Sequence, residues 1–396
     1  MRQSTQRAIV AVALGGSLLG SSPLAFPHAA LKGWTTHNQS PSAFPHAALK
    51  GWTTHNQSPS AFPPAALKGW TTENQFDPQA FLRTYAGFTS QDLARVAAGT
   101  AVARSLTAEP DEVAVAGAVF MAVPRQTWVE RFRDIESFKR NPAVLAIGRF
   151  GSPPSASDMR SLSLDDDDLA ALRRCRPGDC GVRLDQAAMA RIQSAGLQGA
   201  GAEERATTAV REFLSGYAAD YLRRGDAALM EYNDRQRPRR IAAELAMIVN
   251  RSPYFASELS GMRGDVAGFA GVAGSAHEHL VYWSVEKIAS TPTISLTHAI
   301  IAALTSGVTG IATRQIYGSH FFHASLGLTI LADTAGPAGP GVTVIYVNRS
   351  RVDAFTGLLG PVKRAAVRSR AKSGTERLLR DLRTRLEKEQ PASRSR

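Results

Sequence analysis

The sequence predicts an α+β fold, with an antiparallel sheet and a long helix at the C-terminal end. Three observations support this class. Apolar residues alternate over 113–123, which indicates an early strand, and helical periodicity dominates residues 151–274. From Leu280 onward several candidate strands follow one another with Gly and Pro between them, and a helical segment over 363–388 comes last.

Residues 1–25 match the pattern of a secretory signal peptide. Arg2 and Arg7 supply positive charge, residues 8–20 form an apolar stretch of about thirteen residues, and small residues follow it. That stretch is too short to span a bilayer comfortably. We therefore expect the protein to be exported to the periplasm or the extracellular space.

Residues 22–75 consist of three near-identical copies of an 18-residue unit, at 22–39, 40–57 and 58–75. Each copy is rich in Pro and Ser and only sparsely apolar, so it lacks the hydrophobic stripe that stacked structural repeats bury. We predict a duplicated flexible linker. The alternative is a multivalent docking array that uses the Phe and Trp of each copy.

The predicted folded domain spans residues 77–390 and begins with two short helices. Asp77 followed by Pro78 supplies an N-cap and a first-turn proline, and a second helix is expected from about residue 90. Pro124 ends the early strand and starts a helix with apolar side chains at i, i+4 and i+7, namely Trp128, Phe132 and Ile135. Another short strand is expected over residues 143–150.

Residues 151–274 are predicted to form a mostly helical insertion. Helices are expected over 165–174, 185–193, 202–223 and 239–249. Four consecutive carboxylates, Asp165 to Asp168, begin the first of them, and a calcium or magnesium site is one interpretation. Consecutive residues point in different directions on a helix, so we favour a role against the helix N-terminal dipole.

Cys175 and Cys180 are the only cysteines, and they enclose the short sequence Arg-Pro-Gly-Asp. A Pro-Gly turn can bring the two sulfurs within bonding distance, and export places them in an oxidising compartment. We predict a structural disulfide that fixes this turn. The alternative is a redox pair, because neighbouring arginines favour a thiolate, although the spacing is not Cys-x-x-Cys.

The C-terminal part of the domain contains five candidate strands and the long helix. The strands are expected over 280–288, 293–303, 310–322, 325–332 and 341–348, and their order favours an antiparallel sheet. The helix carries an apolar side that must pack on an apolar surface, formed by Leu378, Leu379, Leu382 and Leu386. A disordered tail is expected over 391–396.

The basic charge of the chain is concentrated in one segment. The chain has 46 Lys and Arg against 34 Asp and Glu, a net charge of +12, and residues 363–396 alone hold 12 basic and 4 acidic side chains. An anionic membrane surface is therefore a possible partner for the C-terminal helix. A nucleic-acid partner is not expected, because no aromatic residue interleaves the basic run and no nucleic-acid motif is present.

The order of the predicted strands and helices resembles that of a known fold. The first strand is followed by Val-Pro-x-x-x-Trp-Val-x-x-Phe-x-Asp-Ile-x-x-Phe from Val123, then by antiparallel strands and a long helix. Over residues 113–150 and 280–388 this resembles the helix-grip fold of START-type lipid-transfer domains and polyketide cyclase-like proteins. The resemblance implies an apolar cavity, closed by the C-terminal helix, that binds a lipid or another hydrophobic ligand. The segments 316–322 and 346–351 also look like those of uncharacterised exported bacterial proteins.

Polar residues within the apolar strand runs are the candidate ligand-binding residues. By strand alternation, His298 shares a face with Leu296 and Ile300. If such faces line the concave side of the sheet, the residues that would orient the polar head of a ligand are His298, Arg314, Tyr317 and His320. The alternative for each of them is a core residue with a structural hydrogen-bond partner.

Two other kinds of site are weighed against this one. Several histidines have the residue type of a zinc site, namely His277 and His279 with His298, His320 or His323. We nevertheless expect neither a metal nor a cofactor. The sequence contains no Gly-x-Ser-x-Gly, His-Glu-x-x-His or Walker A motif. The competing function classes are therefore an exported carrier of a hydrophobic ligand and a non-catalytic structural or interaction protein of the cell envelope.

Overall fold

The computed structural model describes residues 76–288, 290–337, 339–353 and 360–389. The predicted signal peptide (1–25), the repeats (22–75) and the tail (391–396) lie outside the described residues. Within those ranges, no helix combines the length and the apolar character needed to cross a membrane.

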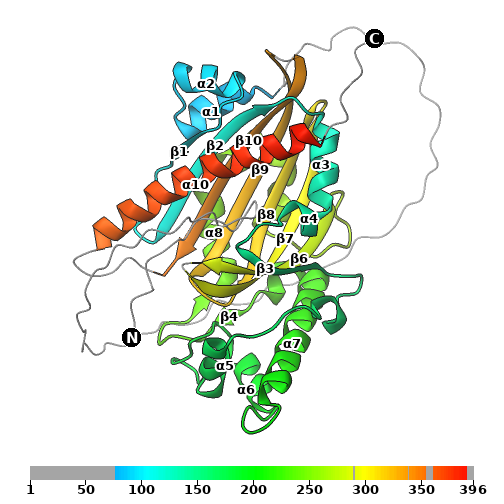
Figure 1. The fold of residues 1–396 in the computed structure, drawn as a ribbon, viewed down its shortest axis with the longest axis vertical. Helices are drawn as coiled ribbons and strands as arrows, with labels where there is room; N and C mark the ends of the chain where they lie inside the picture. The colour runs from blue at the N-terminus through cyan, green and yellow to red at the C-terminus, as the bar shows by residue number, and fades with distance from the viewer. Residues whose placement is uncertain (1–75, 289, 338, 354–359, 390–396) are drawn as a thin grey trace, which may run out of the picture. The chain divides into compact units, whose positions relative to one another are not determined.

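One antiparallel sheet of eight strands forms the centre of the structure (Figure 1). Its strand order is β1-β2-β10-β9-β8-β7-β6-β3. Strands β6 to β10 are neighbours in both sequence and space, so this half of the sheet is a series of hairpins. The strands are β1 (Val102–Ser105), β2 (Glu112–Met121), β3 (Val144–Arg149), β6 (Glu278–Ile288), β7 (Thr291–Thr305), β8 (Val308–Gly318), β9 (Phe322–Gly336) and β10 (Gly339–Val352).

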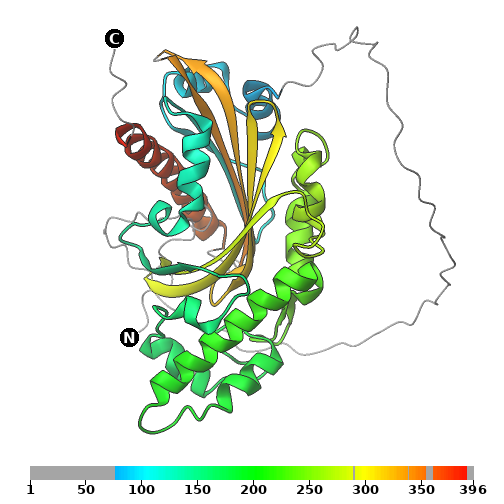
Figure 2. The ribbon, with the colours of Figure 1, turned by 90° about the vertical axis from the view of Figure 1, so that its right-hand side faces the viewer.

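Three helices cover one face of the sheet, which we call the α10 face (Figures 1 and 2). They are α3 (Arg125–Arg133), α4 (Ile135–Phe138) and α10 (Gly360–Lys388). The predicted leucine side of α10 packs here, since Leu379, Leu382 and Leu386 share a buried cluster with Trp128 and with residues of six strands. Gly117 of β2 permits the close approach of α10, because a Cβ atom there would lie only 2.8 Å from Leu379 Cδ1.

The remaining helices lie on the side of the other face, which we call the insertion face (Figure 2). They are α1 (Pro78–Ala86), α2 (Ser90–Ala97), α5 (Asp166–Arg173), α6 (Gln186–Gln193), α7 (Ala202–Arg224), α8 (Ile241–Asn250) and α9 (Arg263–Ala267). The exceptions are α5 and α6, which lie below the lower end of the sheet, where α6 packs on α5 and α7 (Figures 1 and 2). Short 3-10 helices and a two-stranded ribbon connect them, namely η1 (Ala156–Met159), η2 (Gly225–Ala228), η3 (Pro253–Phe255), η4 (Ser260–Met262), β4 (Glu231–Tyr232) and β5 (Arg239–Arg240).

Burial on both faces explains the composition of the strands. In β7, Ala299 and Ile301 join the cluster of the α10 face, whereas Leu296 and Ile300 join the cluster of the insertion face. All ten residues of β2 are buried. A strand covered on two sides has no solvent face, so its sequence is close to a continuous apolar run. At its lower end the sheet curls toward the side of α10 and α4 (Figure 2).

The structure confirms an α+β fold with a large antiparallel sheet and a C-terminal helix. Helices α5 to α8 occur where helices were expected within residues 151–274. Asp77 caps α1 as predicted, because its Oδ1 accepts hydrogen bonds from the backbone N–H groups of Gln79 and Ala80. Asp165 caps α5 in the same way, at 2.7 Å from the backbone nitrogen of Asp168, which agrees with a role at the helix N-terminus.

One prediction about strands was wrong, and one strand was missed. Residues 310–322 were expected to form one strand, but β8 ends at Gly318 and β9 starts at Phe322. The turn between them includes Phe321 in the left-handed region, with φ 62°, a conformation that residue type does not signal. The short edge strand β1 was not predicted. Its four residues are too few for an alternation pattern to stand out.

Candidate functional site

His298 of β7 and Arg314 of β8 lie on the insertion face. They are directly opposite each other in the sheet, and both side chains are buried. As the alternation predicted, Leu296 and Ile300 lie on the same face as His298. The role expected for these residues depended on their strand faces lining the concave side of the sheet. In the structure they face the helices of the insertion, and α10 covers the opposite face.

A continuous hydrogen-bond chain passes through both residues. Arg314 Nη2 donates to Asp226 Oδ1 at 2.6 Å, and its Nη1 donates to the hydroxyl of Tyr221 at 2.9 Å. That hydroxyl lies 2.8 Å from His298 Nδ1, and His298 Nε2 lies 2.8 Å from His279 Nδ1. We call these five residues the His–Tyr–Arg chain. It joins η2 and α7 to β6, β7 and β8.

The proton positions in the His–Tyr–Arg chain follow from its donors. A guanidinium group only donates, so the Tyr221 oxygen accepts from Arg314 and its own proton goes to His298 Nδ1. His298 therefore donates from Nε2 to His279. Burial, reinforced by Arg314 and His279, holds the pKa of His298 well below its ordinary value. A neutral His298 with two hydrogen bonds fits the alternative role, that of a core residue with structural hydrogen-bond partners.

Tyr317 and His320 do not join the His–Tyr–Arg chain. Tyr317 is buried on the insertion face, where its ring centroid lies 6.3 Å from that of Tyr232. His320 Nε2 lies 2.8 Å from Asp168 Oδ1 at the start of α5. The four predicted residues thus divide into one bonded pair, His298 and Arg314, and two residues with separate partners.

The other two histidines of the described residues, His277 and His323, have separate carboxylate partners, Asp265 and Asp353. His277 Nδ1 lies 2.6 Å from Asp265 Oδ2, which also accepts a hydrogen bond from Ser275. Burial, with Arg183 as the next cause, lowers the pKa of His323 to about 3. Across the described ranges, no group of three or more His, Cys, Asp or Glu side chains has an arrangement that could hold a metal ion.

A second buried polar group lies on the α10 face and was not predicted. We call it the β6–β8 polar patch. Tyr282 shares the cluster of α3 and α10, and strand alternation places the polar residues of β6, β7 and β8 on the same face. All members are buried, and they are Lys139, Tyr282, Ser284, Glu286, Ser295, Thr313 and Gln315.

An ion pair anchors one end of the β6–β8 polar patch. Lys139, next to the end of α4, places its Nζ 2.7 Å from Glu286 Oε1, and the two side chains are only 1% and 3% exposed. The same nitrogen lies 5.1 Å above the ring of Tyr282. Burial alone would lower the pKa of Lys139, but the Glu286 carboxylate and, after it, the Tyr282 hydroxyl outweigh burial and raise it. Lys139 is therefore an ammonium ion.

The patch contains one side-chain hydrogen bond within β6 and one between β7 and β8. Ser284 donates to Glu286 Oε1 at 2.8 Å, and Gln315 Nε2 donates to the hydroxyl of Ser295 at 3.0 Å. Ser284 and Ser295 are opposite each other in β6 and β7. The two bonded pairs are therefore on neighbouring positions of the sheet.

Several atoms of this group are buried and have no hydrogen-bond partner among the described residues. They are Tyr282 OH, Glu286 Oε2, Thr313 Oγ1 and Gln315 Oε1, together with Nε1 of the nearby Trp128. Unpaired buried polar atoms are uncommon in native proteins, and each needs an explanation. Their concentration on one face of β6 to β8 marks this place as a candidate binding site.

Apolar clusters lie on both sides of the β6–β8 polar patch. One is the cluster of Trp128, Phe132 and Phe138 with the C-terminal leucines of α10. The other contains Val367 and Ala371 of α10 with strand residues that include Ile288 and Phe322. The interior beneath α10 therefore combines two apolar regions with one polar region, the pattern of a site for an amphipathic molecule.

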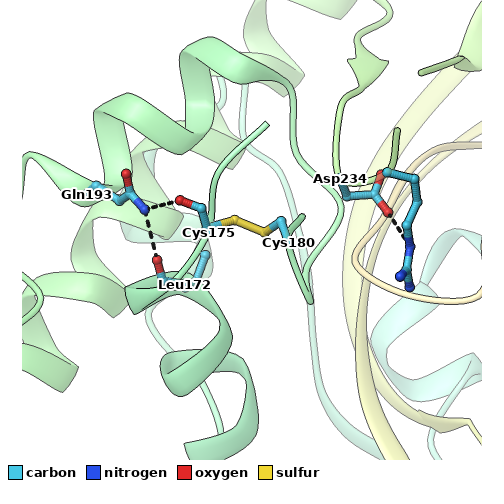
Figure 3. The surroundings of a disulfide bond; sticks show 6 residues. Leu172, Cys175, Cys180, Gln193 and Asp234 are labelled. Atoms are coloured by element: carbon cyan, nitrogen blue, oxygen red, sulfur yellow. Dashed lines mark hydrogen bonds and ion pairs between the residues drawn. A yellow bond between two sulfur atoms is a disulfide. The ribbon is translucent and has the colours of Figure 1, made fainter. Parts of the chain in front are cut away.

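The predicted disulfide is confirmed, since Cys175 and Cys180 are bonded with Cα atoms 4.4 Å apart (Figure 3). The bond closes a turn in which the backbones of Arg176 and Asp179 pair. Gln193 of α6 donates hydrogen bonds to the carbonyls of Leu172 and Cys175, which ties the turn to the neighbouring helix. The disulfide is compatible with an oxidising compartment outside the cytoplasm.

The basic helix α10 neutralises part of its own charge. Lys372 pairs with Glu376 at 3.0 Å, and Arg383 pairs with Glu387 at the same distance, each one helical turn apart. Arg385 donates to the carbonyl of Phe138 at 2.8 Å, so this arginine also fastens α10 to α4. These three basic side chains of α10 therefore have structural roles whether or not the helix meets an anionic surface.

Comparison of the chain with protein-family models, curated proteins and solved structures finds no match.

Proposed function

We propose that the protein binds an amphipathic ligand, a lipid or another largely apolar small molecule, between its sheet and α10. The β6–β8 polar patch carries this proposal. A buried polar atom without a partner costs about 1–3 kcal/mol of stability. A ligand that supplies the missing hydrogen bonds would remove this cost and gain binding free energy from it.

The topology supports the same conclusion. Seven neighbouring strands of the sheet extend from β2 to β3. Along the chain, α3 and α4 follow β2, the first of these strands, and α10 follows β10, the last of them. We take this order as support for the helix-grip arrangement that the sequence resembles, with α5 to α9 added between β3 and β6. In that arrangement the ligand lies between the sheet and the C-terminal helix, which here is the location of the patch.

The proposal changes the residues assigned to the ligand. His298, Arg314, Tyr317 and His320 lie on the other side of the sheet or in the turn after β8, and three of them already have polar partners. Tyr282, Glu286, Thr313 and Gln315 have unpaired atoms instead. We therefore assign head-group contacts to the β6–β8 polar patch and a structural role to the His–Tyr–Arg chain.

The direct test is to purify the protein without detergent, extract it with organic solvent and identify bound compounds by mass spectrometry. We expect an apolar or amphipathic compound to co-purify in near-stoichiometric amount. A Tyr282→Phe/Thr313→Val variant should retain about tenfold less, because it removes two hydrogen-bonding groups that contact the ligand.

Tyr317→Phe is the matched control, since it removes the hydroxyl of a buried tyrosine on the insertion face and should leave retention unchanged. The proposal is wrong if folded wild-type protein yields no such compound and binds none of a panel of apolar fluorophores. Equal losses in the double variant and the control would also contradict it.

A further inference from the structure

We infer that the head group of the bound ligand is uncharged and carries hydroxyl groups, so that it is an alcohol or polyol and not a carboxylate or phosphate. This inference rests on the proposed function and specifies the class of ligand. Its basis is the charge balance and the hydrogen-bonding capacity of the β6–β8 polar patch.

The charge of the patch is already balanced. Among its described members, Lys139 is the only cation and Glu286 the only anion, and they are bonded to each other at 2.7 Å. An anionic head group buried here would leave the site with an uncompensated negative charge, which a protein interior strongly disfavours. A cationic head group would leave the opposite excess. A neutral head group leaves the ion pair intact.

Buried arginines on the insertion face do not offer an alternative counter-ion. Arg314 is paired with Asp226, Arg349 with Glu112, and Arg351 with Glu244 and Asp111. These residues lie on the other side of the sheet, because Ala312, Ile316 and Val347, which share their strand faces, belong to the insertion-face cluster. Each is therefore neutralised and separated from the patch by the backbone of the sheet. On α10 itself, Arg364 and Arg368 each have a buried Nε atom without a partner among the described residues. Arg368 donates from Nη2 to the carbonyl of Ala108, between β1 and β2, and neither arginine forms a hydrogen bond or ion pair with a described member of the patch.

The unpaired atoms define what the head group must offer. Glu286 Oε2 belongs to an ionised carboxylate and only accepts, and Gln315 Oε1 also accepts. The hydroxyls of Tyr282 and Thr313 can donate or accept, and Trp128 Nε1 only donates. Acceptors therefore exceed obligatory donors. A carboxylate or phosphodiester has no proton to give to them, whereas a hydroxyl group both donates and accepts.

The spacing of these atoms favours more than one hydroxyl. Tyr282 and Glu286 are on β6, whereas Thr313 and Gln315 are on β8, with β7 between the two strands. Adjacent strands lie about 4.8 Å apart, so the two sets of backbone positions are separated by about 10 Å. A single hydroxyl cannot reach both sets, but a glycerol-like head group with several hydroxyls can contact them together.

A series of amphiphiles with one shared acyl chain tests this inference. Monododecanoyl glycerol, dodecanoate and dodecyl phosphate are titrated below their micelle-forming concentrations, and affinities are measured by isothermal calorimetry. We expect the glycerol ester to bind at least about tenfold more tightly than either anion. Equal or tighter binding of an anion overturns the inference while the proposed carrier function stands. Binding of none of the three, with no co-purifying compound, rejects the proposed function itself.

A charge variant provides the second test. In Glu286→Gln the Lys139 ammonium has no counter-ion, so the preference should shift toward dodecanoate by about tenfold or more. Thr313→Val leaves the ion pair unchanged and should weaken the glycerol ester without improving dodecanoate, which keeps the test valid if Glu286→Gln does not fold. Tyr317→Phe is the control for both. An unchanged ranking of the ligands in folded Glu286→Gln overturns the inference.

Discussion

The two faces of the sheet bury polar side chains in different ways. On the insertion face, Arg314 and His298 each bond two partners in the His–Tyr–Arg chain. On the α10 face, Thr313 and Trp128 each have a single side-chain polar atom, and that atom has no partner among the described residues. The Tyr282 hydroxyl makes no hydrogen bond of normal geometry there, although it helps to stabilise the Lys139 ammonium. The His–Tyr–Arg chain therefore fixes helices to the sheet, whereas the β6–β8 polar patch retains unused hydrogen-bonding capacity.

Some atoms on the insertion face are also buried without a hydrogen-bond partner, but the two faces still differ. His279 Nε2, His323 Nδ1 and the Nε atoms of Arg314 and Arg349 are buried without a partner. Each belongs to a side chain whose other nitrogen atoms make hydrogen bonds or ion pairs. A side chain that is already bonded gains less from a ligand than one whose only polar atom is unsatisfied.

The largest effect is expected from separating the buried ion pair of the α10 face. Lys139→Met or Glu286→Leu alone should lower the free energy of unfolding by about 3–5 kcal/mol, because the remaining charge is buried without a counter-ion. The double variant should lose far less. Urea unfolding of all four proteins measures the coupling. Additive losses would show that Lys139 and Glu286 do not stabilise each other, and the patch would then not be charge-balanced as we describe.

A pH-dependent effect is expected from the insertion face. The pKa of His298 is lowered in the folded protein, first by burial, then by Arg314 and His279. Tyr221 is the other group bonded to it, and Asp226 neutralises Arg314. Below the ordinary histidine pKa of about 6.5, the unfolded chain binds a proton that folded His298 does not. Stability should therefore be fully present above that pH and fall as the pH decreases, by about 1.4 kcal/mol per unit for this residue.

Urea unfolding between pH 6.5 and 5 measures this slope. His298→Gln should reduce it by one proton, because glutamine does not titrate. His320→Gln serves as the comparison variant, because it removes a histidine that is partly exposed beside Asp168. If His298→Gln leaves the slope unchanged, His298 is protonated in the folded state and the donor order deduced for the His–Tyr–Arg chain is incorrect.

Local patterns in the sequence predicted much of this fold but not its candidate site. The helix after Pro124 and the leucines of α10 follow from periodicity, which involves neighbouring residues only. The key pair of the patch joins residues 147 positions apart, and no local pattern links Lys139 to Glu286. Strand alternation placed His298 correctly with Leu296 and Ile300. It could not show which helices cover that face, because this depends on packing of distant segments.

One signal of the patch was present in the sequence. Ser284, Glu286 and Ser295, like Thr313 and Gln315, recur at every second position within otherwise apolar strands. Such alternation ordinarily indicates a solvent-exposed face. Here these side chains are buried, and Lys139 next to α4 pairs with Glu286, so the pattern indicates a polar interior. Only the sheet order, which brings β6, β7 and β8 together, distinguishes these two interpretations.

The same Tyr→Phe substitution can be made on each face, which compares the two faces directly. The smallest change in stability is expected on the α10 face. Tyr221→Phe removes the hydroxyl that joins Arg314 to His298, leaves both without that partner, and should cost about 1–3 kcal/mol in unfolding free energy. Tyr282→Phe removes a hydroxyl without a partner and should change the stability of ligand-free protein by less than about 0.5 kcal/mol. Thermal and urea unfolding of delipidated protein measure both values. A large loss in Tyr282→Phe would mean that its hydroxyl is already satisfied within the fold, and the distinction between a structural face and a binding face would then fail.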